Sequence, residues 1–190
     1  MTLALSLLLI LVQLAFLCVV LVAFAIVFAG TISVTLDVPY VPTPRRYWSA
    51  IAQALDIQAG DVVYELGSGD GGLLLALARA HPDAQFVGVE LNPPLFWFSQ
   101  VRRALKGSLP NIRFERQDLF MVDLSRADKC YGYLLDPVMG RLLPKLEREA
   151  SGARFVSRAF QFKSKRLIET IVLSTSPGRH GEHLLYVYDL

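Results

Sequence analysis

The sequence predicts an α/β fold with a doubly wound, seven-strand sheet that ends in an antiparallel hairpin, preceded by one N-terminal transmembrane helix. Three observations support this prediction. Residues 1–29 contain no charged side chain. From Asp61 onward, short apolar segments alternate with amphipathic ones, which is typical of a mainly parallel sheet covered by helices. The C-terminal segments 166–174 and 183–190 are predicted to be two strands, joined by a turn around Pro177 and Gly178.

The N-terminal segment has the length and composition of a membrane anchor. A helix over residues 1–29 would span about 44 Å, more than the roughly 30 Å of a bilayer's hydrocarbon core. A cleaved signal peptide is the alternative, and Ala23–Ala25 has the small residues of a cleavage site. That alternative requires a basic start and a shorter apolar run. The sequence therefore favours a retained anchor that contacts the lipid bilayer.

The flanking residues predict which side of the membrane holds the rest of the chain. Arg45 and Arg46 lie within about 15–20 residues of the helix end, where the positive-inside bias acts. Cys18 lies in the apolar run and Cys130 beside a predicted strand, so no disulfide framework is expected, in agreement with a reducing compartment. These features predict a single-pass membrane protein with a cytoplasmic domain. The net charge of +2 argues against nucleic acid as the main partner.

Three parts are predicted along the chain: an anchor over residues 1–29, a juxtamembrane linker over 30–43 and one folded domain over 44–190. Pro39 and Pro42 argue against a helix through the linker. Thr43 is predicted to cap a helix that starts at Pro44. That helix would place Trp48, Ile51 and Leu55 on one buried face. In the rest of the domain, strands are expected at 62–66, 85–90, 111–118, 131–136 and 153–160, and helices at 73–82, 95–107 and 144–150.

The stretch "ELGSGDGG", residues 65–72, marks the expected ligand site. It follows the first strand, and ligands of open α/β sheets bind at the carboxyl ends of strands. Gly67 and Gly69 would let the backbone pass close to a ligand. A tight turn without a ligand is the alternative, but it needs fewer glycines. Glu90 ends the second strand, where a carboxylate accepts the ribose hydroxyls of either NAD or S-adenosylmethionine.

Three further observations favour S-adenosylmethionine over NAD. Glu65 lies just before the glycines, where an acid would face a cationic amino group but would repel a pyrophosphate. Asp118 ends the third strand and would accept from the adenine amino group, with the apolar Leu119 beside the ring. The chain after the linker is also about one ordinary domain, which leaves no room for a separate dehydrogenase substrate domain.

Several motifs resemble a known family. "ELGSGDG", "GVELNP", "QDLF" and the closing hairpin together resemble the Rossmann-like sheet of class I methyltransferases, over roughly residues 40–190. "YVPTP", "VELNPPLFWFSQVRR" and "LLPKLEREASGARFVSRAFQF" resemble the membrane-associated protein-lysine methyltransferases that act on the c-subunit of ATP synthase and on the adenine nucleotide translocase. The resemblance implies methyl transfer to a lysine of a membrane-associated protein. The expected residues that bind S-adenosyl-L-methionine are Glu65, Gly67, Ser68, Gly69, Glu90, Asn92, Asp118 and Leu119.

The sequence gives a weaker signal for catalytic residues than for cofactor-binding ones, because methyl transfer from a sulfonium to an amine requires mainly positioning and exclusion of water. Asp136 is the candidate catalytic residue, which would hold the incoming lysine or accept its proton, and an Asp-Pro turn is the alternative. The dispersed histidines predict no metal site. Two other functions remain open: transfer to a lipid, quinone or other small apolar acceptor, and a tethered S-adenosylmethionine-binding module without turnover.

Aromatic residues near the expected site have more than one interpretation. Phe98, with Val101 and Leu105 in helical register, is expected to pack against the domain. Trp97 would flank the adenine or meet the membrane interface. Tyr40 and Thr43 would close over the cofactor, although Thr43 is equally explained as a helix cap.

Overall fold

The structure is a computed structural model that describes residues 2–35, 40–107, 109–174 and 183–190. It divides into two units, Met1–Pro39 and Tyr40–Leu190. The turn at Pro177 and Gly178 and the histidine at position 180 lie outside the described residues.

The first unit contains one long helix, α1, over Thr2–Thr35. Its stretch Leu5–Ala25 has a mean hydropathy of 3.1 and is long and apolar enough to cross a membrane, by length and composition. The helix continues past the anchor boundary predicted at residue 29, so the predicted linker begins inside it. Gly30 and the β-branched residues after it lower helix propensity by about 1 kcal/mol or less each, which is too little to end the helix at residue 29. The first residue that strongly disfavours a helix is Pro39.

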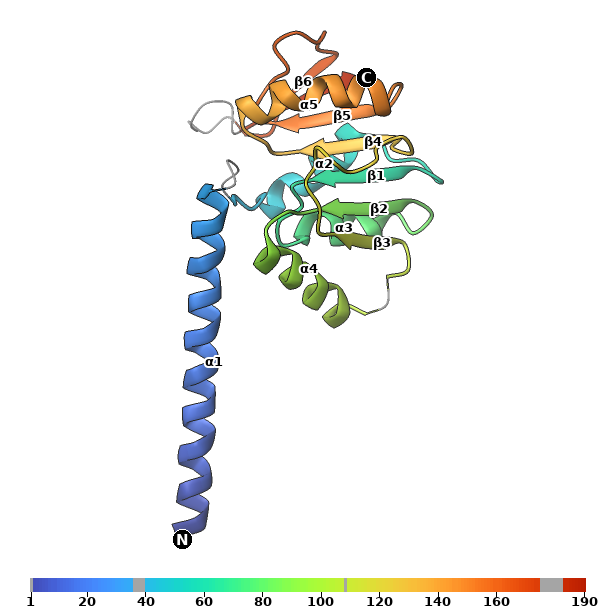
Figure 1. Cartoon of the computed structure of the whole chain (residues 1–190). Coiled ribbons are helices and arrows are strands. Elements are labelled where there is room, and N and C mark those ends of the chain that lie inside the picture. Colours follow the sequence, from blue (N-terminus) through green and yellow to red (C-terminus); the bar gives the residue numbers. More distant parts are fainter. Residues whose placement is uncertain (1, 36–39, 108, 175–182) are drawn as a thin grey trace. The chain divides into compact units, whose positions relative to one another are not determined.

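The second unit is built on one seven-strand mixed sheet, with the order β3-β2-β1-β4-β5-β7-β6 (Figure 1). Strands β1 to β5 are parallel, and β7 is antiparallel to both of its neighbours. This arrangement confirms the predicted Rossmann-like sheet with its closing hairpin. The strands are β1 Val62–Leu66, β2 Gln85–Val89, β3 Ile112–Glu115, β4 Lys129–Gly132, β5 Arg154–Arg158, β6 Glu169–Val172 and β7 Leu184–Asp189.

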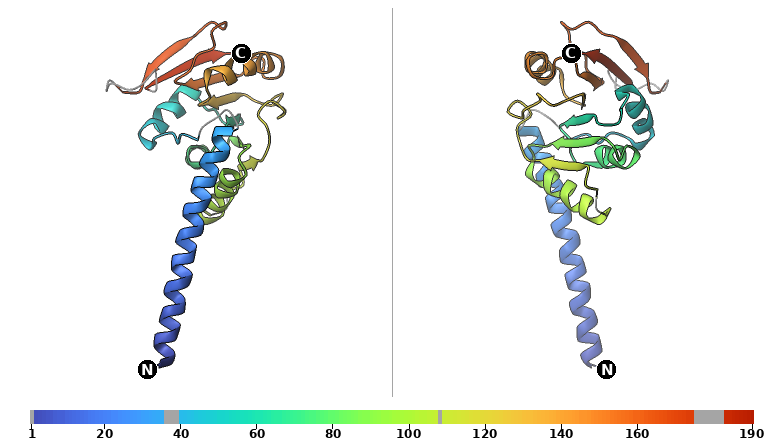
Figure 2. Two further views of the ribbon diagram at one scale, coloured as in Figure 1. Left: turned by 60° about the vertical axis from the view of Figure 1, so that its left-hand side comes forward. Right: turned by 90° about the vertical axis from the view of Figure 1, so that its right-hand side faces the viewer.

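Helices cover the sheet on two sides. They are η1 Arg45–Tyr47, α2 Trp48–Leu55, α3 Gly72–Ala80, α4 Pro93–Leu105 and α5 Asp136–Glu149. Helices α2 and α3 pack on one face and α5 lies on the other (Figure 2). The core between the sheet and α2 and α3 contains Ile51, Leu55 and Phe86. The predicted buried face of the first domain helix is confirmed, because Ile51 and Leu55 are fully buried and Trp48 packs against the same core.

Two boundaries near β4 differ from the prediction. The fourth strand was expected at residues 131–136, but β4 ends at Gly132, where its pairing with Leu66 of β1 also ends. The helix expected to start at Pro144 begins at Asp136, with Pro137 in its first turn, and Pro144 lies inside it. Pro144 removes the hydrogen bond to the carbonyl of Gly140 four residues earlier. Gly140 is exposed, so water can satisfy that carbonyl.

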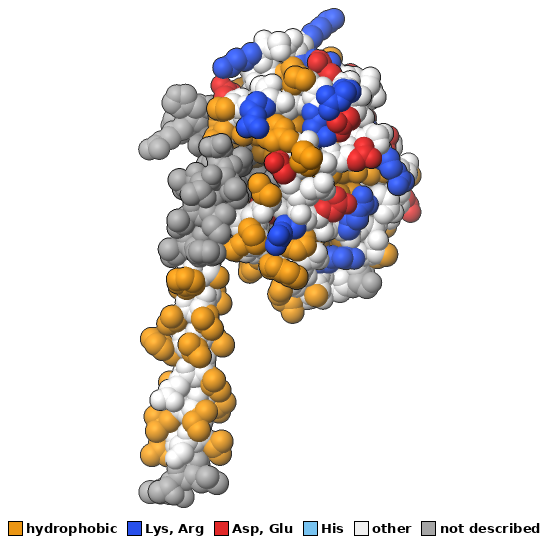
Figure 3. Space-filling view, in the orientation of Figure 1, with side chains coloured by type: hydrophobic (Ala, Val, Ile, Leu, Met, Phe, Trp, Pro, Cys, Tyr) orange, Lys and Arg blue, Asp and Glu red, His pale blue; other side chains and the backbone are white. Residues whose placement is uncertain are grey.

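Two predictions about the helices are wrong. Thr43 does not cap the first helix: Pro44 is the residue before η1, and the Thr43 hydroxyl lies 3.3 Å from the Tyr131 hydroxyl instead. On α4, Phe98, Val101 and Leu105 point outward and are 53%, 55% and 82% exposed. Figure 3 shows hydrophobic side chains gathered at the lower edge of the domain, where Figure 1 places α4.

Candidate active site

The glycine loop after β1 is fixed to the neighbouring strand. The backbone N–H groups of Gly67 and Ser68 both donate to the carbonyl of Val89, at 2.9 Å each. Gly67 and Gly69 have φ of +79° and +54°, in the left-handed region that favours glycine. A Cβ on Gly69 would lie 2.6 Å from the ring of Tyr40. The loop therefore presents bare backbone at the carboxyl end of β1, with Tyr40 against it.

The glycine at the start of α3 has a different role. Gly71 has φ +69°, and a Cβ there would lie 2.5 Å from Cζ of Phe114 on β3. Gly88 on β2 lies equally close to this ring, because a Cβ there would also clash with Phe114. These glycines make room for an aromatic ring of the core, so not every glycine of the motif is available to a ligand.

Glu90, directly after β2, holds the loop in place. Its Oε2 accepts the Gly69 N–H and its Oε1 accepts the Asn92 N–H, both at 2.8 Å. Burial raises the pKa of Glu90, and the N–H donors of Asn92, Gly69 and Leu91 oppose that rise. Each carboxylate oxygen has a second lone pair, so Glu90 can still accept hydroxyl donors from a ligand.

Glu65 and Ser68 carry buried polar atoms without partners. Among the residues that the structure describes, Glu65 Oε2 and Ser68 Oγ have no hydrogen-bond partner although both are buried. Burial raises the pKa of Glu65 well above its usual value, and the charges of Asp70 and Glu90 raise it further. Such orphaned acceptors are rare in folded proteins. A carboxylate cluster of this kind is suited to a cationic ligand and unsuited to a phosphate.

Asp70 and Arg102 form an ion pair that the sequence did not predict. Arg102 Nη1 lies 2.5 Å from Asp70 Oδ2, and Asp70 Oδ1 accepts the Gly72 N–H at 2.8 Å. Burial, followed by the Asp70 charge, raises the pKa of Tyr40. The pair joins α4 to the loop, against which the Tyr40 ring lies. The acid within the glycine motif was the available signal, but its partner on α4 has no fixed spacing.

The remaining predicted cofactor residues lie in turns after β2 and β3. Asn92 is buried and caps α4, with its Oδ1 accepting the Leu95 N–H at 3.3 Å. Asp118 Oδ1 accepts the Phe120 N–H at 2.9 Å, which stabilises the turn that contains Leu119. Each residue thus has a structural role beside its predicted role in ligand binding.

Asp136 was expected to end the fourth strand, but it does not. It lies beyond the end of β4 at the first position of α5, with its side chain 45% exposed and its Oδ2 3.2 Å from Nζ of Lys163. Tyr133 lies closer to the strand end and stacks with Phe160, with ring centroids 6.4 Å apart. Tyr133 and Phe160 follow the neighbouring strands β4 and β5, and neither was predicted to be a site residue.

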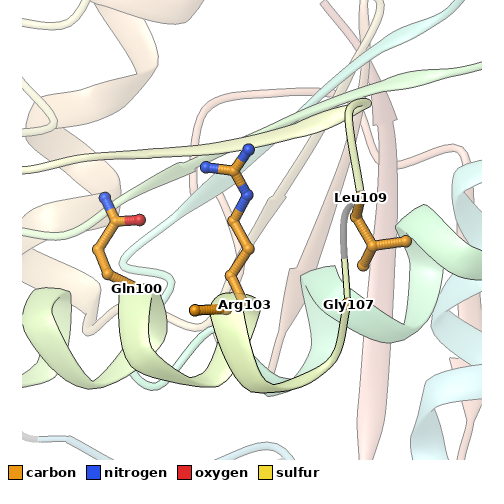
Figure 4. Close-up of a pocket in the computed structure, with 5 residues that line it drawn as sticks. Gln100, Arg103, Gly107 and Leu109 are labelled. Atoms are coloured by element: carbon orange, nitrogen blue, oxygen red, sulfur yellow. The ribbon is translucent and has the colours of Figure 1, made fainter.

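Two other kinds of site are a metal centre and a surface hollow. Within the described part of the chain, no group of three or more His, Cys, Asp and Glu side chains is placed to hold a metal ion. A hollow of about 300 Å³ lies along α4, away from the glycine loop, and Figure 4 shows Gln100 and Arg103 rising from the same side of the helix into it. Its other lining residues are Ala104, Gly107 and Leu109.

Known proteins match this chain over most of the domain. The ANTKMT methyltransferase domain matches residues 65–168. A protein-lysine N-methyltransferase of Saccharolobus islandicus is 31% identical, over 80% of this chain and 92% of that relative. The ATP synthase C-subunit lysine N-methyltransferase of Xenopus laevis is 34% identical over 67% of this chain, which spans 55% of that longer relative.

Solved structures agree with the sequence matches. An RNA methyltransferase from Salinibacter ruber, in complex with S-adenosyl-L-homocysteine, superposes with a TM-score of 0.70 and 30% identity, over 78% of this chain and 92% of that one. The family match covers more than half of the present chain, and the glycine loop and mixed sheet are those that the sequence predicted. The chain therefore belongs to the ANTKMT methyltransferase domain family and is a class I S-adenosylmethionine-dependent methyltransferase.

Proposed function

We propose that the protein is a membrane-anchored enzyme that methylates lysine on a membrane-associated protein. The main support for a protein-lysine acceptor is the similarity to the protein-lysine N-methyltransferase of Saccharolobus islandicus, at 31% identity over 92% of its length. A second relative, the ATP synthase C-subunit lysine N-methyltransferase of Xenopus laevis, is also named for a protein substrate.

The residues of the glycine loop fit S-adenosylmethionine. The orphaned Glu65 Oε2 is an acceptor for a cationic amino group, and the orphaned Ser68 Oγ is a further polar partner. When bound, the cofactor supplies a methyl group that is already activated by its sulfonium charge. The residues that we propose to hold it are Glu65, Gly67, Ser68, Gly69, Glu90, Asn92, Asp118 and Leu119.

The side chains of the domain would do three things for this reaction. Glu90 would accept the ribose hydroxyls while it keeps Gly69 in place. Tyr40 would cover the loop and exclude water, because its ring already lies against Gly69. Asp136 would attract the protonated acceptor lysine by charge, in competition with Lys163. We assign Asp136 this binding role.

The apolar helix α1 supports a membrane location for the enzyme. Its stretch Leu5–Ala25 passes the length and composition test for a membrane span. We propose that α1 is a retained single-pass anchor and that Tyr40–Leu190, the compact second unit, is the cytoplasmic catalytic domain. A membrane-spanning anchor keeps the enzyme at a high effective concentration near acceptors in the same bilayer.

Labelled methyl donor tests the proposal. The full chain, purified in detergent, is incubated with methyl-labelled S-adenosylmethionine and membranes from cells that lack the protein. Label in a protein band, recovered as methyllysine after acid hydrolysis, is the expected result. Label only in the lipid extract would support the alternative of a lipid or quinone acceptor, and label only in RNA would favour the activity named for the Salinibacter ruber structure.

A binding measurement separates an enzyme from a binding module. S-adenosylmethionine that binds without any transfer to protein, lipid or RNA would identify the chain as a tethered binding module. Carbonate extraction of membranes from cells that produce the full chain tests the anchor, because an inserted helix stays in the pellet. Release of the protein to the supernatant would contradict a membrane-spanning α1.

A further inference from the structure

The outward face of α4 is an unpartnered apolar surface. It consists of Trp97, Phe98, Val101 and Leu105, which recur at helical spacing and are 62%, 53%, 55% and 82% exposed. We call these four residues the α4 face. The Arg102 guanidinium borders them, with its Cζ 5.5 Å from the centroid of the Phe98 ring, and the N-terminal end of the helix also carries Pro94. Contiguous exposed apolar patches mark interaction sites.

Packing on the opposite side of α4 fixes this orientation. Leu95 and Ser99 are buried against the domain, and Ser99 Oγ is satisfied by the Phe96 carbonyl at 2.7 Å. Arg102 is drawn inward by its ion pair with Asp70. The helix therefore cannot turn its apolar side into the core without breaking that pair.

Cations gather beside the C-terminal end of the α4 face. Arg79 Nη2 donates to the backbone carbonyl of Lys106 at 2.5 Å. Burial, and then the charges of Arg79, Arg102 and Arg45, lower the pKa of Lys106. Arg103 is not part of this cluster: it lies about half a helical turn from the centre of the α4 face, and Figure 4 shows its guanidinium rising into the hollow instead. The charge of Asp70 raises the pKa of Lys106, but Asp70 is already paired with Arg102.

An apolar helix face with cations at its edge has the chemistry of an anionic lipid surface. Apolar and aromatic side chains enter the boundary between headgroups and acyl chains, while Lys and Arg contact the phosphates. Trp97 at one end of the face fits this boundary, which tryptophan prefers. Residues 36–39 alone separate the last described residue of α1 from Tyr40, so an inserted α1 would keep the domain within reach of the same bilayer.

We propose that the α4 face docks on an anionic lipid bilayer, with Lys106 at the C-terminal end of the helix against the headgroup phosphates. This inference rests on the membrane anchoring in the proposed function and adds a second, peripheral membrane contact to it. Asn92 caps α4 and lies two residues from Glu90. Docking along α4 would therefore hold the glycine loop close to the membrane surface, where a membrane-associated acceptor is found.

Tryptophan fluorescence of the full chain in vesicles tests the contact. The protein has two tryptophans, so the difference between wild type and Trp97→Phe isolates Trp97, and Trp48 serves as the internal control. Vesicles contain phosphatidylcholine with about one third phosphatidylglycerol and a spin-labelled lipid as quencher. We expect quenching of Trp97 several times stronger than that of Trp48, and protection of Trp97 from aqueous iodide.

A label on α1 reports the anchor separately. Cys130 is buried, with its pKa raised to about 12 mainly by burial, whereas Cys18 is exposed on α1. An environment-sensitive fluorophore attached in detergent therefore reacts at Cys18. Emission typical of hydrocarbon from Cys18, with Trp97 as open to iodide as in detergent, would overturn the α4 inference and leave the anchor standing. Aqueous emission from Cys18 would refute the anchor, and the Trp97 quenching would still decide the α4 contact.

Variants sharpen the result. Lys106→Gln should lower the ratio of docked to undocked domain about fivefold, the contribution of one cation near an anionic surface, whereas Arg103→Gln, on the other side of α4, should leave it unchanged. Val101→Glu should abolish Trp97 quenching, and Val172→Glu, on the exposed strand β6, is the matched control that should not. Equal effects of both Glu variants would refute docking through α4. A lipid-independent change in Trp97 emission that grows with protein concentration would instead indicate a second copy of the chain and overturn the proposal.

Discussion

Substitution of Glu65 by Gln is expected to stabilise the cofactor-free protein and to weaken cofactor binding. The wild-type Oε2 is buried without a partner, and Asp70 and Glu90 add like charge. The variant removes the charge and keeps the shape. Residues that are selected for ligand binding often lower the stability of the ligand-free protein, and Glu65 is expected to be one of them.

The sign of the pH dependence follows from the raised pKa of Glu65. The folded state binds the proton more tightly than the unfolded state, so this contribution to stability is complete below the ordinary pKa of 4.5. It is lost as pH rises through the folded pKa. The advantage of Glu65→Gln should therefore grow as pH increases from about 4.5. At neutral pH we expect a gain of about 1–3 kcal/mol, the cost of an unsatisfied buried polar group.

Urea unfolding of wild type and Glu65→Gln between pH 4.5 and 8, without ligand, measures this gain. Titration calorimetry with S-adenosylmethionine measures the loss of affinity, which we expect to be roughly 10- to 100-fold for one charge-assisted hydrogen bond. Glu90→Gln is the matched control, because both Glu90 oxygens accept backbone N–H groups. It should weaken binding without stabilising the free protein. Unchanged or lower stability of Glu65→Gln at neutral pH would refute the reasoning.

Three further predictions concern the same region. Gly71→Ala places a Cβ 2.5 Å from Phe114 at a φ of +69°, so thermal unfolding should show a loss of about 2–4 kcal/mol from overpacking and strain; a loss below 1 kcal/mol would contradict this packing. Asp136→Asn should raise KM for the protein acceptor about fivefold, with stability changed by less than about 1 kcal/mol, and Lys163→Gln should lower KM; steady-state kinetics that show no change in either variant would remove Asp136 from the acceptor site. Tyr40→Ala uncovers Gly69 and should weaken S-adenosylmethionine binding by about tenfold in the same calorimetric assay, and full retention of affinity would exclude a covering role.

Strand positions and the glycine loop could be predicted because local patterns determine them. The continuous apolar run of β1 belongs in the centre of a parallel sheet, and the alternating burial of Ile112 and Phe114 belongs at its edge. Glu65 near the end of β1 and Glu90 directly after β2 lie at the same edge of the sheet, because parallel strands share their carboxyl ends. Glu65 and Glu90 could therefore be placed together from spacing alone.

Helix orientation could not be predicted in the same way. Helical spacing on α4 identified an apolar face but not the direction in which it points. The direction depends on Arg102 pairing with Asp70 and on Ser99 satisfying its hydroxyl within its own helix, and both are contacts without a sequence period. The start of α5 was misplaced for a related reason, since Pro137 and Pro144 are both compatible with a first turn. Only the end of the β4 pairing at Gly132 decides between them.

The shared acceptor at Val89 determines how the glycine loop can move. Because Gly67 and Ser68 both donate to that carbonyl, the loop cannot swing open without fraying the end of β2. Amide hydrogen exchange at these two positions should therefore follow the slow opening of the β1–β2 strand pair and not the faster motion of a surface turn. Turnover in this enzyme would then be gated from the Tyr40 side of the loop, while the floor of the site stays still from one catalytic cycle to the next.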